Sequence, residues 1–171
     1  MNKNDLRFQK TELAIKSAYF LLNQQGAVSV KVNVLCETAN INKTTFYAHY
    51  ETVEHLHKQV CKEFVVALLS QCQDVDKFLT DTRSFAFSVL STFESRLPVI
   101  EMLYNNDLYA FVNDVEAIFM EKYVPKSISE DYKLSIRFCI GGAFKLLVAE
   151  KNPVRIQKTV DLVEYVLHSQ I

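Results

Sequence analysis

Apolar residues recur at helical spacing through most of this chain. The first such set is Ile15, Ala18, Tyr19 and Leu22. These positions follow the i, i+3, i+4, i+7 pattern and predict a helix over about residues 9–25. Gly26 follows the helix and can adopt the left-handed conformation in which many helices end.

Two shorter helical segments come next. The spacing of Val32, Leu35 and Cys36 predicts a helix over about 32–38. Asn42 can cap a further short helix, because its side-chain oxygen can accept a backbone N–H of the first turn. Thr52 can cap a longer helix that reaches about Cys72.

The remainder of the chain has the same periodicity. Asp81 is expected to begin a helix that ends or bends at Leu97-Pro98, since a residue before proline disfavours helix. Further helices are predicted over about 107–123, from Ser127 to about 151, and over about 153–168. The start at Ser127 rests on the sequence SISE, which has the form of a capping box.

The composition agrees with an all-α fold. Three glycines and three prolines among 171 residues are few for a sandwich or barrel, which needs many tight turns. The most apolar run, 138–148, is too short to span a bilayer, and the N-terminus has no apolar signal-peptide core. The four cysteines form no CxxC pair, so we expect reduced thiols without disulfides. We therefore expect a soluble cytoplasmic protein without a metal site or membrane contact.

Charge is distributed unevenly along the chain. Residues 1–62 contain eight lysines and arginines against five acidic residues, a net charge of +3. The remaining residues contain eleven against fifteen, a net charge of −4. The N-terminal part is therefore the better candidate for contact with an anionic partner.

The stretch NINKTTFYAHY, residues 40–50, combines an apolar side with an unusual polar side. Phe46 and Tyr50 lie four residues apart and are expected to face inward. The other side carries hydroxyl, ammonium, phenol and imidazole groups and no carboxylate. Such groups donate hydrogen bonds to phosphate oxygens, and threonine can also contact a thymine methyl group. A solvated helix face is the alternative, and the pattern favours DNA contact.

The first third of the chain resembles the TetR family of one-component transcriptional regulators, and the spacing of the matching residues agrees without gaps over about fifty residues. The matching positions are Ala14-Ile15, Ala18, Leu22, Gly26, Val32, Leu35-Cys36, Ala39, Ile41-Asn42, Thr45-Phe46-Tyr47, His49 and Leu56. More weakly, Gly141-Gly142 resembles a glycine pair in the penultimate helix of one branch of that family. The resemblance implies a homodimer whose two helix-turn-helix heads enter successive major grooves of a palindromic double-stranded DNA operator.

The resemblance also assigns roles to individual residues. Lys43 and Thr44 fall where the family reads base edges or neighbouring phosphates, and Thr45, Tyr47 and His49 fall on phosphate-contacting positions. The sequence departs from the family at two further places. Lys31 replaces a capping serine or threonine, although it could reach a phosphate. Val53 replaces a lysine that usually begins the next helix, and this removes about one phosphate contact.

The glycine pair suggests a dimer interface. Each glycine inside a helix costs about 1 kcal/mol relative to alanine, so two in succession need a reason, such as close approach of another backbone. In the family the last two helices pair across a two-fold axis as a four-helix bundle. We therefore expect an interface made by 130–150 and 153–168, with contacts from Phe138, Gly141, Gly142, Lys145, Val160, Val163 and Leu167. The alternative to an interface is that the two glycines bend their helix beside a bound ligand.

Other functions have less support. No serine or cysteine nucleophile lies in a catalytic motif, and His57 with Cys61 makes only one pair at metal-ligand spacing. We expect that the protein is not an enzyme and that it has no cofactor and no metal site. The aromatic residues after position 80 could form a plain core or line a cavity for a small apolar or aromatic effector.

The sequence thus predicts an all-α protein with a three-helix helix-turn-helix DNA-binding domain in 1–50 and a connecting helix in 51–73. Residues 74–171 would form a helical bundle that dimerises and can bind a ligand. The expected function is a homodimeric TetR-type repressor, released from its operator by a small-molecule effector. The alternative is a TetR-like protein that acts through protein contacts, with weak or no specific DNA binding.

Overall fold

The computed structural model describes residues 6–26, 29–73, 75–105, 107–149 and 154–169. All regular structure within these ranges is helical: eight α-helices and one short 3₁₀ helix, η1 (Val75–Lys77). The all-α prediction is confirmed. No helix of the described part is long and apolar enough to cross a bilayer.

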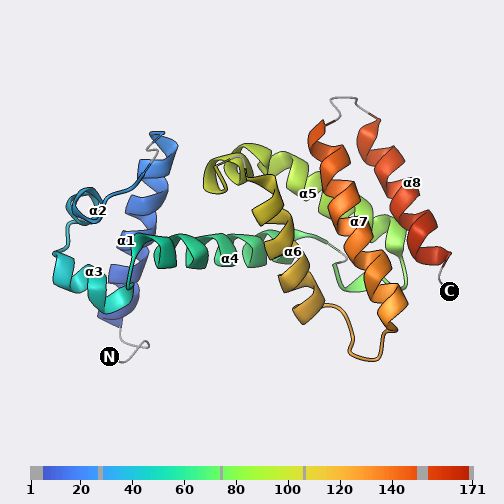
Figure 1. Ribbon diagram of the computed structural model, residues 1–171, viewed down its shortest axis with the longest axis horizontal. Helices are drawn as coiled ribbons and strands as arrows, with labels where there is room; N and C mark the ends of the chain where they lie inside the picture. Colours follow the sequence, from blue (N-terminus) through green and yellow to red (C-terminus); the bar gives the residue numbers. More distant parts are fainter. Residues whose placement is uncertain (1–5, 27–28, 74, 106, 150–153, 170–171) are drawn as a thin grey trace. The chain divides into compact units, whose positions relative to one another are not determined.

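The chain divides into two compact units, residues 1–62 and 63–171. The first unit contains α1 (Leu6–Gln24), α2 (Val32–Ala39), α3 (Lys43–His49) and the first half of α4 (Val53–Gln71). The division falls between Lys62 and Glu63, so α4 contributes residues to both units (Figure 1).

In the first unit, α1 packs on α2 and α2 packs on α3. The predicted apolar face of α1 is buried. The helix begins at Leu6, three residues before the predicted start, and Phe8 in this additional turn extends the buried face. Gly26 ends the helix region with a φ of +78°, in the left-handed range that glycine adopts without strain.

The second unit contains the second half of α4, η1 and four long helices. These are α5 (Thr82–Leu103), α6 (Leu108–Lys122), α7 (Glu130–Ala149) and α8 (Arg155–His168). α8 packs on both α5 and α7, and α6 packs on α7 (Figure 1). The predicted first residue of the last helix, 153, lies outside the described residues.

Most helix starts agree with their predicted caps, and one does not. The side chain of Asp81 accepts a backbone N–H of α5, as predicted, and Asp107 caps α6 in the same way without having been predicted to do so. At α7 the predicted cap, Ser127, is wrong: residues 125–128 form a turn, and Ser129 Oγ accepts the N–H of Tyr132 at 3.2 Å instead. A serine placed directly before the first helical residue is closer to the open donors than one placed three residues earlier.

Of the two outcomes predicted at Leu97-Pro98, an end or a bend of the helix, the end is wrong. The helix continues through Leu97-Pro98 to Leu103, and Ile100 and Leu103 are buried beyond the proline. Burial of these apolar side chains outweighs the local preference of proline to end a helix.

Candidate nucleic-acid interface

Two asparagines define the position where α3 begins. Asn40 ends α2 in the left-handed conformation, with φ 53°, and its backbone N–H donates to carbonyls of the last turn. Asn42 then caps α3, and its Oδ1 accepts the backbone N–H of Thr45 at 2.7 Å. The chain therefore turns from α2 into α3 within residues 40–42, as the asparagines predict.

The inner side of α3 is held by apolar burial and one polar cluster. Phe46 and Tyr50 are almost completely buried, as predicted. Tyr50 Oη donates to Glu12 Oε1 on α1 at 3.3 Å, and Gln59 Nε2 on α4 donates to the same oxygen at 3.2 Å. Lys16 forms an ion pair with Glu12 at 2.7 Å and, with Tyr50, lowers the pKa of that carboxyl. Glu12 thus links α1, α4 and the C-terminal end of α3.

The outer side of α3 exposes three of the predicted contact residues. Lys43 and Thr44 are exposed, and Tyr47 has 56% of its surface accessible although it is a large aromatic residue. The Thr45 hydroxyl is half-buried and donates to Asn42 Oδ1 at 2.9 Å, so its proton is used within the cap. Together with Ala48, these three residues form the exposed side of α3.

His49 does not face outward with them, so the prediction that it lies on the outer side of α3 is wrong. Its ring stacks on Phe8 of α1, with ring centroids 3.9 Å apart and planes 20° from parallel. Both ring nitrogens are shielded from solvent, and within the described residues neither has a hydrogen-bond partner. Burial lowers the pKa of this histidine, with Glu12 acting in the opposite direction. The ring therefore packs α3 against α1.

Lys31 and Val53 lie at the starts of the neighbouring helices. Lys31 occupies the N-cap position of α2, is exposed, and makes no side-chain cap hydrogen bond. Its ammonium can therefore extend toward an anion. At α4, Thr52 Oγ1 accepts the N–H of His55 at 3.0 Å, which confirms the predicted cap. Val53 is half-buried and offers no donor at the position where a lysine was expected.

The histidine and cysteine at metal-ligand spacing form a different contact. His57 Nδ1 lies 2.8 Å from the Tyr19 hydroxyl, and the Cys61 sulfur lies 3.7 Å from the imidazole nitrogens. Tyr19 and Cys61 are buried, so this polar contact lies inside the packing of α1 on α4. Among the described residues, no group of three or more metal-ligating side chains occurs.

The predicted dimer-interface residues divide into two sets. Phe138 (71% accessible) and Lys145 are exposed on α7, and Gly141 and Gly142 lie between them on the same helix. A Cβ added to either glycine meets nothing within 4 Å. Packing within the described chain therefore gives no reason for a glycine at these two positions.

The second set is on α8 and lies in the chain's own core. Val160, Val163 and Leu167 are buried within the chain, whereas the sequence analysis placed them in a dimer interface. α5 and α7 cover this face of α8. The large apolar residues that α8 leaves exposed are Leu162 and Tyr165, the latter 73% accessible.

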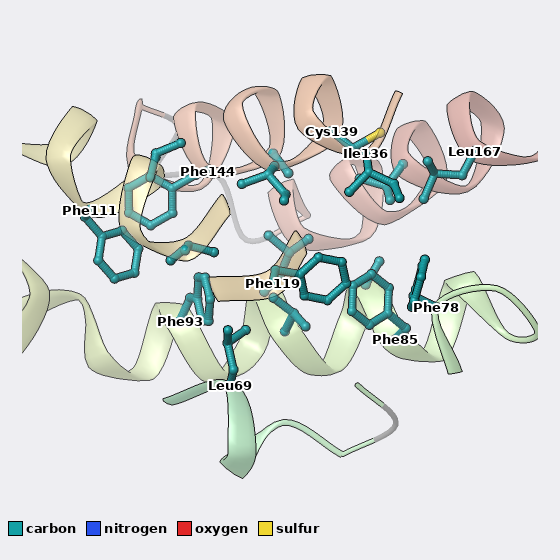
Figure 2. A pocket seen from close by; sticks show the side chains of 18 residues that line it. Leu69, Phe78, Phe85, Phe93, Phe111, Phe119, Ile136, Cys139, Phe144 and Leu167 are labelled. Carbon is teal, nitrogen blue, oxygen red and sulfur yellow. The ribbon is translucent and has the colours of Figure 1, made fainter. Parts of the chain in front are cut away.

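The second unit contains an apolar cavity of about 70 Å³ (Figure 2). Its lining consists of Leu69, Phe78, Phe85, Ala86, Val89, Leu90, Phe93, Phe111, Val112, Val115, Phe119, Ile136, Cys139, Ile140, Ala143, Phe144, Val163 and Leu167. Four of the aromatics weighed from the sequence, Phe85, Phe93, Phe111 and Phe119, are among them.

Comparisons with family models, curated proteins and solved structures find no match to this chain.

Proposed function

We propose that this protein is a DNA-binding transcriptional regulator of the TetR type, acting as a homodimeric repressor. The observation that carries the proposal is the division of α3 into two faces. Phe46 and Tyr50 fix the helix from inside, while Lys43, Thr44 and Tyr47 are exposed outside. A surface helix that is fixed from behind and free of carboxylates suits insertion into a DNA groove.

In this proposal α2 and α3 are the helix-turn-helix pair. Lys43 and Thr44 lie in the first turn of α3 and contact base edges or neighbouring phosphates, while Tyr47 and Lys31 bind phosphates. Thr45 contributes through its place in the N-terminal turn of α3, since its hydroxyl is engaged by Asn42. His49 supports the helix from behind.

The dimer follows from the operator geometry and from the α7 surface. Two heads related by a two-fold axis would read half-sites about 34–36 Å apart. The exposed Phe138 and the half-buried Gly141 and Gly142 on α7, together with the exposed Leu162 and Tyr165 on α8, supply the surface for a second copy. Two adjacent helices from each subunit would then form a four-helix bundle.

Regulation in this proposal requires no catalysis. A small-molecule effector that binds better to a conformation with misplaced heads shifts the population away from the DNA-binding state. The decrease in operator affinity then equals the difference in effector affinity between the two conformations.

The first test is a gel-shift titration of the full chain with the DNA upstream of its own gene. Lys43→Ala is expected to weaken binding and to reduce the slope of log K against log salt by about 0.9, the contribution of one phosphate contact. Tyr47→Phe removes only a hydroxyl and is expected to weaken binding by about 1 kcal/mol, or roughly fivefold. Lys122→Ala, an exposed lysine on α6, is the matched control and should leave both quantities unchanged.

Two results distinguish this function from its alternative. Retardation that falls with salt and depends on Lys43 supports the DNA-binding regulator. If the wild-type chain fails to retard any duplex at low salt, the protein instead acts through protein contacts.

A further inference from the structure

The imidazole of His49 is buried where the end of α3 meets α1. Its ring stacks on Phe8 with centroids 3.9 Å apart, and both ring nitrogens are shielded from solvent. Neither nitrogen has a hydrogen-bond partner among the residues that the structure describes. A neutral imidazole here loses the two hydrogen bonds that it makes in water, and the protonated ring would also lose its ionic hydration. The position therefore suits the neutral ring and opposes the cation.

His49 belongs to a series of ring contacts that connects three helices. It also lies against Tyr50, the residue after α3, with centroids 6.3 Å apart and planes 30° from parallel. The Tyr50 ring meets the ring of His55 on α4 edge-on, with centroids 5.9 Å apart. Ring contacts thus run from Phe8 on α1 through the end of α3 to α4. A change at His49 alters the middle of this series, where α3 is held.

The charged groups near His49 do not stabilise its protonated form enough to offset burial. Among the described residues, Glu12 on α1 is the charged group that acts on His49, and it favours the proton. Its carboxylate already accepts hydrogen bonds from Lys16 at 2.7 Å and from Tyr50 at 3.3 Å. The other titratable neighbours in the ring series are the Tyr50 phenol and the His55 imidazole, which are not anions at neutral pH. Burial therefore outweighs Glu12 and lowers the pKa of His49.

We propose that His49 is an acid-sensitive switch that holds α3 on α1 when neutral and releases it when protonated. The proton binds the ring nitrogen that is bare in the neutral form, and the charged ring leaves Phe8 for water. A ring in water binds this proton better than the buried ring does. The released form therefore gains population as the pH falls below about 6.5.

The release affects the exposed side of α3. This helix has only seven residues and needs tertiary contacts to keep its position. Phe46 remains an anchor that the proton does not alter, so the change is confined to the C-terminal turn, which carries the exposed Tyr47. That this turn contacts DNA rests on the proposed function, whereas the release itself rests on the contacts of His49. A proton thereby becomes an inhibitor of operator binding.

The first experiment follows α3 in the absence of DNA. Amide hydrogen exchange of the full chain is measured by NMR at pH 7.5 and pH 5, as protection factors that correct for the intrinsic pH dependence of exchange. The main probe is the N–H of Tyr50, which donates to the Phe46 carbonyl at 2.9 Å across the last turn of α3. Its protection is expected to fall about tenfold at pH 5, which corresponds to a pKa difference of about one between the released and the buried ring. His49→Phe keeps a ring on Phe8 without a site for the proton and should retain its protection.

Two further variants complete this experiment. His168→Gln removes an exposed histidine of α8, in the other unit, and should follow the wild type. His49→Leu replaces His49→Phe if that variant does not fold. Equal losses of protection in the wild type and in the His49 variant, or no loss in either, overturn the proposal.

The second experiment repeats the gel-shift titration at pH 7.5 and pH 5, and each protein is compared with its own affinity at pH 7.5. Protonation of other histidines acts on the wild type and on His49→Phe alike, so the difference between the two isolates His49. The wild type is expected to lose about tenfold more affinity than His49→Phe. A smaller loss in the wild type, as when a released imidazolium binds a phosphate, overturns the inhibitory role, and so does an equal response. If no protein retards DNA at either pH, the proposed function fails while the amide measurement still decides the switch.

Discussion

At the scale of single residues, α3 depends on its neighbours for its position. Seven residues are too few for a helix that is stable in isolation, so tertiary contacts must hold it. Phe46 is fully buried, and truncation to alanine at such a site typically costs 3–5 kcal/mol. The residues that would touch DNA contribute little to this stability, which leaves their identity free to serve recognition.

His49 gives a prediction about pH. Its pKa is lowered in the folded state, so between the ordinary value of about 6.5 and the lowered value the unfolded chain holds more protons. Stability from the neutral ring is complete above about pH 6.5 and is lost as pH falls through that window. We expect the urea midpoint to decrease between pH 7.5 and pH 5, and to decrease less in His49→Phe, which keeps a ring to stack on Phe8.

The matched control for this prediction is His55→Gln, because His55 is an exposed histidine. It should show the same pH dependence as the wild type. If instead His49→Phe follows the wild-type curve, the His49–Phe8 stack does not control acid sensitivity.

The sequence predicts the residues of α3 as far as local rules apply. Asn42 as cap, with Phe46 and Tyr50 inside, follows from spacing and side-chain chemistry alone. His49 lies at the edge of the apolar arc, three residues after Phe46, so its direction depends on what is available to cover it. Phe8 covers it, and Phe8 fell before the predicted start of the first helix. The misplaced boundary of one element therefore caused the wrong orientation of a residue in another.

At the scale of elements, helical periodicity identifies an apolar face without identifying what covers it. The face of α8 with Val160, Val163 and Leu167 was predicted correctly as apolar and wrongly as a dimer contact. A second copy and the chain's own α5 and α7 bury such a face equally well. Only the three-dimensional packing distinguishes these two partners, and here it is the chain itself that covers α8.

Pro98 gives a prediction about α5. Proline inside a helix costs about 3 kcal/mol through its lost hydrogen bond and ring clash, while its restricted unfolded state returns up to about 1 kcal/mol. Pro98 is exposed, so little packing is lost on truncation. Pro98→Ala is therefore expected to stabilise the protein by about 2 kcal/mol, measured by urea unfolding.

The control is Arg96→Ala, an exposed position one residue before Leu97, which should change stability by no more than about 0.5 kcal/mol. A loss of stability in Pro98→Ala would show that Pro98 stabilises the folded protein. The proline would then produce a bend that is needed to bury Ile100 and Leu103.

At the scale of the whole molecule, the two units carry separate parts of the proposed function. Residues 1–62 contain the exposed face of α3 and a net charge of +3, and residues 63–171 contain the cavity and the exposed apolar residues of α7 and α8. The charge difference was readable from the sequence. The cavity was not, because the same phenylalanines serve a filled core, and only their packing reveals the space between them.

The association state is the last prediction, and it depends on α7. Phe138 and Leu134 expose large apolar surfaces beside two glycines that leave open space, an arrangement that a second backbone can approach closely. Stable association requires about 1,000 Å² of buried surface or more, and a charge in the centre of such an interface opposes it strongly.

Sedimentation equilibrium at micromolar concentration should give a dimer for the wild type and a monomer for Phe138→Asp. Tyr109→Asp, which alters a 77% accessible aromatic residue on α6, should remain dimeric. A monomeric wild type would exclude the two-headed reading of a palindrome, and dissociation by both variants would place the interface beyond α7.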